Sequence, residues 1–186
     1  DWKVDVAGLK KAVDGFDGFS IVYFVNPNNP TSTVTPASEI ELWVKSKPDN
    51  TLFIADEAYA EYVSDPNFKS MANLIQDGLD NVVLLKTFSK LYAMAGMRVG
   101  FAVGAPAIIK MMKDQVAGEK LNYPGVTAAL VSLDDEPFQE YSRASNLESR
   151  KILASCFDKL GVKYPPSSTN FMFFELNEPI RAFQKK

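Results

Sequence analysis

Four short polar clusters carry the side chains of this sequence that could do chemistry. They lie at residues 26–31 (Asn-Pro-Asn-Asn-Pro-Thr), 56–59 (Asp-Glu-Ala-Tyr) and 87–90 (Thr-Phe-Ser-Lys), and at Arg98. Together they offer amides, carboxylates, hydroxyls, an amine and a guanidinium. The first three each follow an apolar run that predicts a strand. Ligands of open α/β sheets bind at the carboxyl ends of the strands, so this placement indicates a ligand site.

Each cluster also has a purely structural interpretation. Asn-Pro and Asn-Asn-Pro are ordinary turn formers. An aspartate after a strand is often the N-cap of the next segment. A Ser-Lys pair is commonly a helix cap beside a solvated charge, and a single arginine is usually a surface residue. Taken one at a time, the clusters leave both interpretations open.

The composition excludes several other kinds of chemistry. The 186 residues include no histidine, which rules out Ser-His-Asp and Cys-His mechanisms and histidine-ligated metals. Cys156 is the single cysteine, so no internal disulfide can form. Twenty basic and 23 acidic residues give a net charge of −3, which offers no electrostatic surface for nucleic acid or an anionic membrane. No apolar run approaches the roughly 18 residues of a membrane helix. We expect a cytoplasmic protein without nucleic-acid, membrane or metal partners.

Four apolar runs predict the strands that position these clusters. Residues 21–25, 52–55 and 82–85 are continuous apolar runs, and residues 99–103 follow as a fourth. Continuous runs are typical of strands covered on both faces in a parallel sheet. Helices are expected after Thr35-Pro36, which supply an N-cap and a first-turn proline, around residues 71–75, and over residues 108–116. This alternation predicts an open α/β sheet.

The pattern changes after about residue 118. A short helix is expected over residues 126–133 and a long one over residues 137–160, with Gly161 as its C-cap. The apolar side chains of the long helix predict a buried stripe of Phe138, Tyr141, Ile152, Leu153, Cys156, Phe157 and Leu160. Residues 171–174 then predict a strand, and Pro179 the start of a further helix.

The order of the polar clusters resembles a known family. The three motifs, the last of which continues to Gly100, are similar to those of fold-type-I pyridoxal-phosphate enzymes. They look most like class I/II aminotransferases of the histidinol-phosphate aminotransferase kind. The resemblance implies the three-layer α/β/α large domain of the pyridoxal-phosphate-dependent transferase fold, followed by a small α+β domain. Residues 1–134 would be part of the large domain, and residues 135–186 the beginning of the small one.

The resemblance gives four of these residues roles around the cofactor ring. Lys90 matches the lysine that forms a Schiff base with pyridoxal 5′-phosphate and then carries a proton to and from the substrate. Asp56 matches the carboxylate that keeps the pyridine nitrogen protonated. Tyr59 and Asn29 match the two groups that hydrogen-bond the phenolic oxygen.

Three further residues match the phosphate site. The hydroxyls of Thr87 and Ser89, the amides of a helix start and the guanidinium of Arg98 would hold the dianion. Gly96 is expected to let the chain turn so that Arg98 points inward. Ser32 stands where the family usually has glycine, and a positive φ there would cost serine on the order of 1 kcal/mol.

The implied reaction is reversible transfer of an amino group between an amino acid, or a related amine such as histidinol phosphate, and a 2-oxo acid. The resemblance also implies a homodimer. Three alternatives remain: a decarboxylase or carbon-sulfur lyase with the same cofactor cradle, the ligand sensor of a transcription regulator, and an inactive fragment. The family's glycine-rich phosphate turn, stacking aromatic and substrate-binding arginine are not matched. We therefore expect the middle and later part of such an enzyme.

Overall fold

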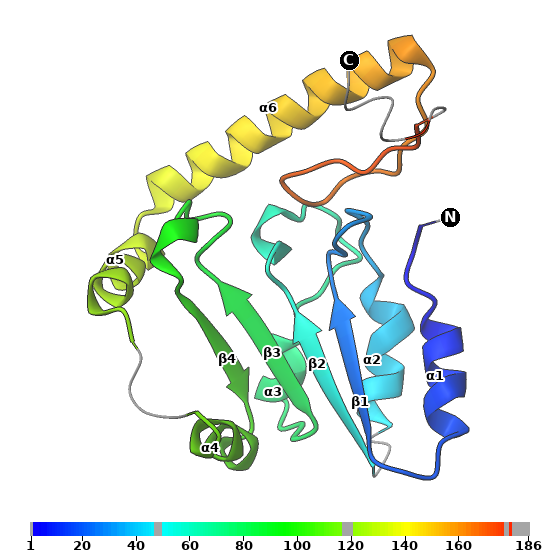
Figure 1. Cartoon of the computed structure of the whole chain (residues 1–186), viewed down its shortest axis with the longest axis vertical. Coiled ribbons are helices and arrows are strands. Elements are labelled where there is room, and N and C mark those ends of the chain that lie inside the picture. The colour runs from blue at the N-terminus through cyan, green and yellow to red at the C-terminus, as the bar shows by residue number, and fades with distance from the viewer. Residues whose placement is uncertain (1, 47–49, 117–120, 177–178, 180–186) are drawn as a thin grey trace.

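A computed structural model describes residues 2–46, 50–116, 121–176 and 179 of the chain. At its centre lies a four-stranded sheet in the order β1-β2-β3-β4 (Figure 1). The strands are β1 (Ser20–Val25), β2 (Thr51–Asp56), β3 (Val82–Thr87) and β4 (Gly100–Gly104). All four predicted strands are confirmed, and so is the α/β class of the fold.

The sheet is mixed, because β4 runs antiparallel to β3 whereas β1, β2 and β3 are mutually parallel. Parallel neighbours need a long crossover, usually a helix, to bring the chain back to the starting edge. The connection from Thr87 to Gly100 contains only the short 3-10 helix η2 (Ala95–Met97) and stays at the carboxyl edge of β3. Strand β4 therefore starts at that edge and returns in the opposite direction.

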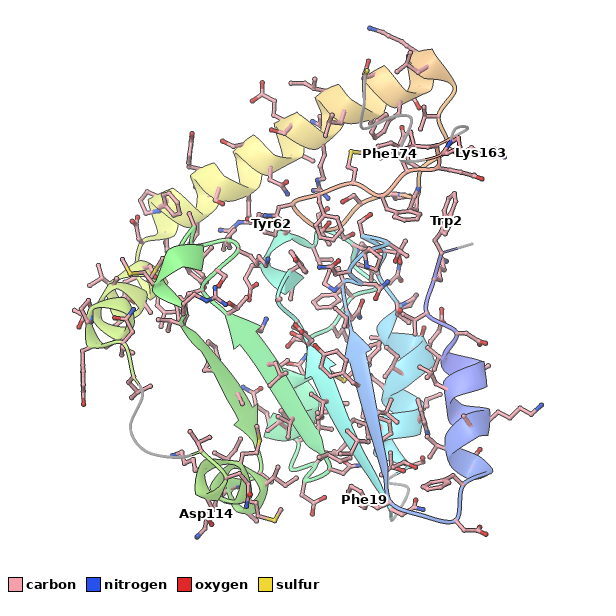
Figure 2. All side chains as sticks on the ribbon, viewed as in Figure 1. Trp2, Phe19, Tyr62, Asp114, Lys163 and Phe174 are labelled. Carbon is pink, nitrogen blue, oxygen red and sulfur yellow. The ribbon has the colours of Figure 1, made fainter. Side chains whose placement is uncertain are left out.

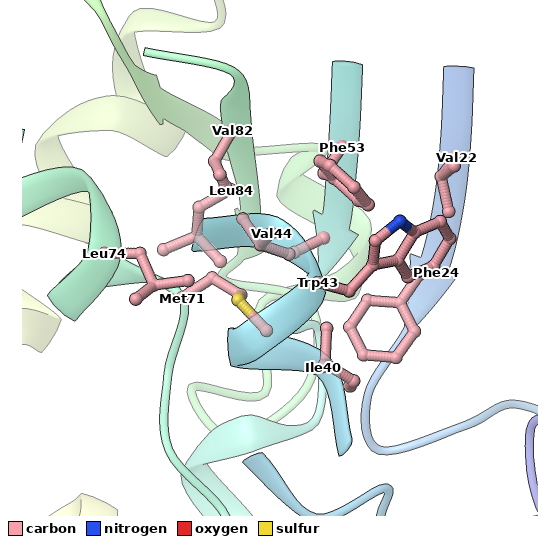
Figure 3. Packing of buried hydrophobic residues seen from close by; sticks show 11 residues of the cluster. Val22, Phe24, Ile40, Trp43, Val44, Phe53, Met71, Leu74, Val82 and Leu84 are labelled. Carbon is pink, nitrogen blue, oxygen red and sulfur yellow. The ribbon is translucent and has the colours of Figure 1, made fainter. Parts of the chain in front are cut away.

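Helices α1 (Val6–Asp14), α2 (Ala37–Lys45) and α3 (Ala72–Gln76) pack against one face of the sheet. Figure 3 shows side chains of β1, β2 and β3 meeting Ile40, Trp43 and Val44 of α2. The rings of Trp43 and Phe53 meet edge to face, with 4.9 Å between their centres. Burying such a side chain stabilises the fold by roughly 1.5–3 kcal/mol. The packing between these helices and the sheet fixes the positions of the strands. It thereby also fixes the carboxyl ends of the strands, which carry the polar clusters.

The opposite face of the sheet is open in the described part of the chain. Ile21 and Tyr23 of β1 project from it with 60% and 54% of their surface exposed. The strands were predicted to be covered on both faces, but the described residues cover only the face that packs against α1, α2 and α3. The apolar side chains of this second face explain why the runs are continuous rather than alternating.

Three more helices follow β4: α4 (Pro106–Asp114), α5 (Tyr123–Leu133) and α6 (Glu136–Leu160). Helix α6 runs past the carboxyl ends of the parallel strands (Figure 1). The Asp135 side chain caps its first turn, and Gly161 ends it in the left-handed conformation, φ 66°, as predicted. Every helix among the described residues is too short or too polar to cross a bilayer.

The predicted buried stripe of α6 is wrong. Its members Tyr141, Ile152, Leu153 and Leu160 are 44 to 70% exposed, and Cys156 is exposed as well. Phe138 and Phe157 are partly covered. The spacing identified the helix correctly, but the described residues cover this stripe only in part, with the rings of Tyr164 and Phe174 against Phe157.

The predicted strand at residues 171–174 is also wrong, because this segment pairs with none of the strands in the described part of the chain. Its rings pack instead: Phe171 against Tyr59, Phe173 against Trp2, and Phe174 against Phe157. Figure 2 shows Phe174 and Trp2 on the side of the molecule where α6 ends. The helix expected from Pro179 lies outside the described residues.

Two helix starts differ from the prediction. Helix α2 begins after Pro36 without a side-chain cap. Thr35, the expected cap, is held by its backbone, which donates from N to Asn26 Oδ1 and accepts from Asn26 Nδ2, both at 2.9 Å. Helix α1 was not predicted, although Asp5 caps it by accepting from Gly8 N at 2.9 Å.

Candidate functional site

A pocket of about 320 Å³ opens at the carboxyl ends of β2 and β3. It is lined by Asp56, Ala58, Leu85, Lys86, Thr87, Ser89, Lys90, Ala95 and Arg98. Five of the seven predicted site residues therefore share one pocket. The other two, Asn29 and Tyr59, are joined by a hydrogen bond of 3.2 Å from Asn29 Nδ2 to the Tyr59 hydroxyl.

Lys90 connects these two groups of residues. It lies two residues after Phe88, which is buried, and one residue before Leu91, which packs against Tyr59 and Tyr62. These anchors fix the backbone on both sides of the lysine. Its Nζ lies 5.0 Å from the centre of the Tyr59 ring, within the range of a cation–π contact. The amine thus faces both the pocket and the Asn29–Tyr59 pair.

Asp56 is held by donors on both of its carboxylate oxygens. Oδ1 accepts from the backbone N–H of Ala58 at 3.0 Å, and Oδ2 accepts from the hydroxyl of Tyr23 at 2.5 Å. That hydrogen bond, with smaller contributions from burial and the carboxylate charge, raises the pKa of Tyr23 to about 12. Sequence reasoning missed Tyr23, because its position inside an apolar strand gave no sign of a polar partner.

The predicted phosphate residues lie next to one another. Thr87 Oγ1 accepts from the backbone N–H of Ser89 at 3.1 Å. Arg98 Nη1 donates to Ser89 Oγ at 3.5 Å and to the carbonyl oxygen of Ala95 at 2.6 Å. Two hydroxyls and a guanidinium therefore line one end of the pocket.

Two local details of this segment correct the prediction. No α-helix starts after Lys90; the described chain forms turns and then η2. The turn toward Arg98 also does not depend on a positive φ at Gly96. Arg98 itself adopts the left-handed conformation, with a φ of 53°. The backbone conformation that aims the guanidinium is thus adopted by the arginine, and the phosphate amides would come from turns.

Ser32 shows the strain that the sequence indicated. Its φ is 61°, its surface is fully buried, and its hydroxyl has no hydrogen-bond partner. Its carbonyl oxygen accepts from the N–H of Ser168 at 2.8 Å, which ties this loop to the segment after α6. Glycine would suit this position better than serine, because it lacks the Cβ that makes a positive φ unfavourable.

A buried ion-pair network braces the pocket from the helical side of the sheet. Glu57 is 1% exposed and accepts from Ser70 Oγ and Met71 N, each at 2.7 Å. Lys86 Nζ lies 3.2 Å from Glu57 and 2.8 Å from Glu61. Burial lowers the pKa of Lys86, but the charges and hydrogen bonds of Glu61 and Glu57 outweigh it and raise the pKa overall. The network joins β2 to β3 beside Asp56 and Thr87.

The family of the chain follows from comparison with known proteins. The sequence model described as aminotransferase class I and II matches residues 1–186, and the chain belongs to that family. It is 37% identical to histidinol-phosphate aminotransferase of Lysinibacillus sphaericus over 172 residues, which are 92% of this chain and 46% of that protein.

Two solved structures show the same fold. A proposed histidinol-phosphate aminotransferase from Erwinia carotovora atroseptica is 54% identical, with a TM-score of 0.97 over 99% of this chain and 53% of its own. Histidinol-phosphate aminotransferase from Sinorhizobium meliloti, solved with pyridoxal-5'-phosphate, is 28% identical, with a TM-score of 0.87 over 96% of this chain and 48% of its own. The chain thus spans about half the length of these relatives.

Proposed function

We propose that this chain forms the cofactor-binding part of a pyridoxal-phosphate-dependent aminotransferase. The reaction is transfer of an amino group between an amino acid, or a related amine such as histidinol phosphate, and a 2-oxo acid. The observation that carries the proposal is the pocket that collects Asp56, Lys90 and Arg98 with their neighbouring hydroxyls. The names of the relatives support the choice of substrate class.

The groups that line the pocket fit this cofactor by their chemistry. Pyridoxal phosphate presents an aldehyde, a pyridine nitrogen, a phenolic oxygen and a phosphate dianion. The chain offers an amine at Lys90, a carboxylate at Asp56, the Asn29–Tyr59 pair, and two hydroxyls with a guanidinium. Each group of the cofactor therefore has a partner of the right charge and hydrogen-bonding type.

Lys90 is the proposed nucleophile and proton carrier. When bound, the cofactor supplies an aldehyde for covalent attachment and a ring that withdraws electrons from the substrate α-carbon. A lysine released from such an attachment has a free Nζ that can take a proton and return it. The 5.0 Å contact with the Tyr59 ring keeps this Nζ beside the Asn29–Tyr59 pair.

Asp56 is the proposed partner of the ring nitrogen. Its carboxylate accepts from Tyr23 and Ala58, and each of its oxygens retains a lone pair for another donor. Arg98, Ser89 and Thr87 are the proposed phosphate ligands. Tyr59 and Asn29 are the proposed donors to the phenolic oxygen, and their existing hydrogen bond places both polar groups together.

The organisation of the complete enzyme is part of the proposal. Residues 1–134 would belong to the large domain and residues 135–186 to the small one, with α6 beginning close to this boundary. A homodimer and a cytoplasmic location are proposed on the family resemblance. The residues assigned here hold the cofactor and do not choose the substrate. A decarboxylase or carbon-sulfur lyase would use the same cradle.

Half-reactions test the proposed activity. The purified protein is loaded with pyridoxal phosphate and mixed with a panel of amino acids and histidinol phosphate. We expect at least one amine to convert the cofactor stoichiometrically to pyridoxamine phosphate, with release of a 2-oxo acid from an amino acid or of a ketone from histidinol phosphate. Release of carbon dioxide or a thiol without pyridoxamine phosphate would contradict transamination. Lys90→Ala should show no turnover.

A further inference from the structure

The Tyr23 hydroxyl donates a hydrogen bond of 2.5 Å to Oδ2 of Asp56. From this contact we propose that Tyr23 is a positioning residue, which fixes the Asp56 carboxylate in the orientation that receives the ring nitrogen of the cofactor. This inference rests on the proposed function, and it adds a residue from β1 to a site otherwise assigned to later segments.

The strand register brings the two side chains together. Tyr23 lies opposite Ile54 in the parallel β1–β2 pair, and Val25 lies opposite Asp56. Paired residues share a face and side chains alternate along a strand, so Tyr23, Ile54 and Asp56 point to the same face. The tyrosine therefore starts two residues before the aspartate level and reaches along the strand direction with its long ring.

Two donors on different oxygens determine how the carboxylate is turned. The N–H of Ala58 holds Oδ1 at 3.0 Å, while the Tyr23 hydroxyl holds Oδ2. A carboxylate with a single donor can rotate about its Cβ–Cγ bond, whereas two donors fix its plane. Among the described residues, no cation lies within ion-pair distance of Asp56, so these hydrogen bonds set its orientation.

Tyr23 is suited to this role because it stays a donor. Its pKa of about 12 keeps the hydroxyl protonated throughout the neutral range. Tyr23 lies on the open face of the sheet and is 54% exposed, so its ring adds little to the buried core. Removal of the hydroxyl alone should therefore change the orientation of the Asp56 carboxylate without disturbing the packing of β1.

A double-mutant cycle tests whether Tyr23 acts through Asp56. The probe is pyridoxamine 5′-phosphate, which has no aldehyde and so binds without attachment to Lys90. Its dissociation constant is measured for the wild-type protein, Tyr23→Phe, Asp56→Ala and the double variant. We expect Tyr23→Phe alone to weaken binding about tenfold, because the Asp56 carboxylate then loses the donor that fixes its plane. In the Asp56→Ala background the same change should alter binding less than about twofold.

Tyr141→Phe is the matched control, because Tyr141 is 67% exposed on α6 and does not line the pocket. It should bind as the wild type does, and thermal unfolding should show all variants folded. Equal losses from Tyr23→Phe in both backgrounds would overturn the inference, and so would unchanged affinity in Tyr23→Phe. If the wild-type protein fails to bind the probe, the proposed function falls and this inference falls with it.

Discussion

The amine of Lys90 lies 5.0 Å from the centre of the Tyr59 ring, and the Tyr59 hydroxyl accepts a hydrogen bond from Asn29. Three segments of the chain are thereby joined: the loop after β1, the turn after β2 and the turn after β3. The carboxyl ends of parallel strands meet at one edge of a sheet, which is how residues so far apart in sequence come together.

The guanidinium of Arg98 should act on the phosphate and on nothing else in the ligand. We expect Arg98→Met to weaken binding of pyridoxal phosphate about 10- to 100-fold, since a hydrogen bond to a charged group contributes about 1.5–3 kcal/mol. Binding of pyridoxal, which lacks the phosphate, should not change. Lys110→Met on the exposed surface of α4 is the control. Equal losses for both ligands would show that Arg98 does not bind the phosphate.

Breaking the ion pair between Glu57 and Lys86 should destabilise the fold. Glu57→Gln leaves the Lys86 charge without one of its two partners in a nearly buried setting, where such losses cost about 3–5 kcal/mol. Glu61→Gln should cost less, because the Glu61 side chain is more exposed, 23% against 2% for Glu57. Urea unfolding of the two variants measures the difference. If Glu57→Gln were the milder of the two, the network would not brace the pocket as described.

Ser32→Gly should stabilise the protein by about 1 kcal/mol, because it removes both the Cβ at a φ of 61° and an unpartnered buried hydroxyl. The control is Ser38→Gly in the first turn of helix α2, where the greater backbone freedom of glycine should instead cost a few tenths of a kcal/mol. Thermal unfolding compares the two changes, and opposite signs are expected. A loss of stability in Ser32→Gly would mean that the serine makes a compensating contact.

Alkaline pH should weaken the contact between Tyr23 and Asp56. The folded pKa of Tyr23, about 12, lies above the ordinary value of 10.0, so the protein binds this proton more tightly than the unfolded chain does. The resulting stabilisation is fully present below pH 10 and is lost as the pH rises through 12. Ultraviolet titration should show a tyrosine of the wild type ionising near 12 and its disappearance in Tyr23→Phe. Identical titrations of the two proteins would contradict the hydrogen bond.

The sequence predicted what short-range patterns determine. Apolar runs located the four strands, Gly161 located the end of α6, and the ordered motifs located residues that meet in one pocket. Helix α1 was missed, because its short apolar pattern was not recognised behind the Asp5 cap. The antiparallel direction of β4 was missed because a strand's residues do not specify the direction of its neighbour.

Other errors arose from long-range partners. The α6 stripe has helical spacing, but burial requires an element that packs on it, and spacing cannot supply one. Phe171 to Phe174 were predicted as a strand from composition, whereas their contacts are with rings from distant segments. Tyr23 escaped notice for the same reason: its partner Asp56 is 33 positions away and becomes adjacent only through strand pairing.

Covalent mapping of the cofactor tests the central claim most directly. The protein is incubated with pyridoxal 5′-phosphate, reduced with borohydride and digested, and the modified peptide is identified by mass spectrometry. We predict a phosphopyridoxyl group on Lys90, with no such label there in Lys90→Ala and little on neighbouring Lys86, which its two glutamates hold as an ammonium. A label spread over surface lysines, with Lys90 unmodified, would contradict the account.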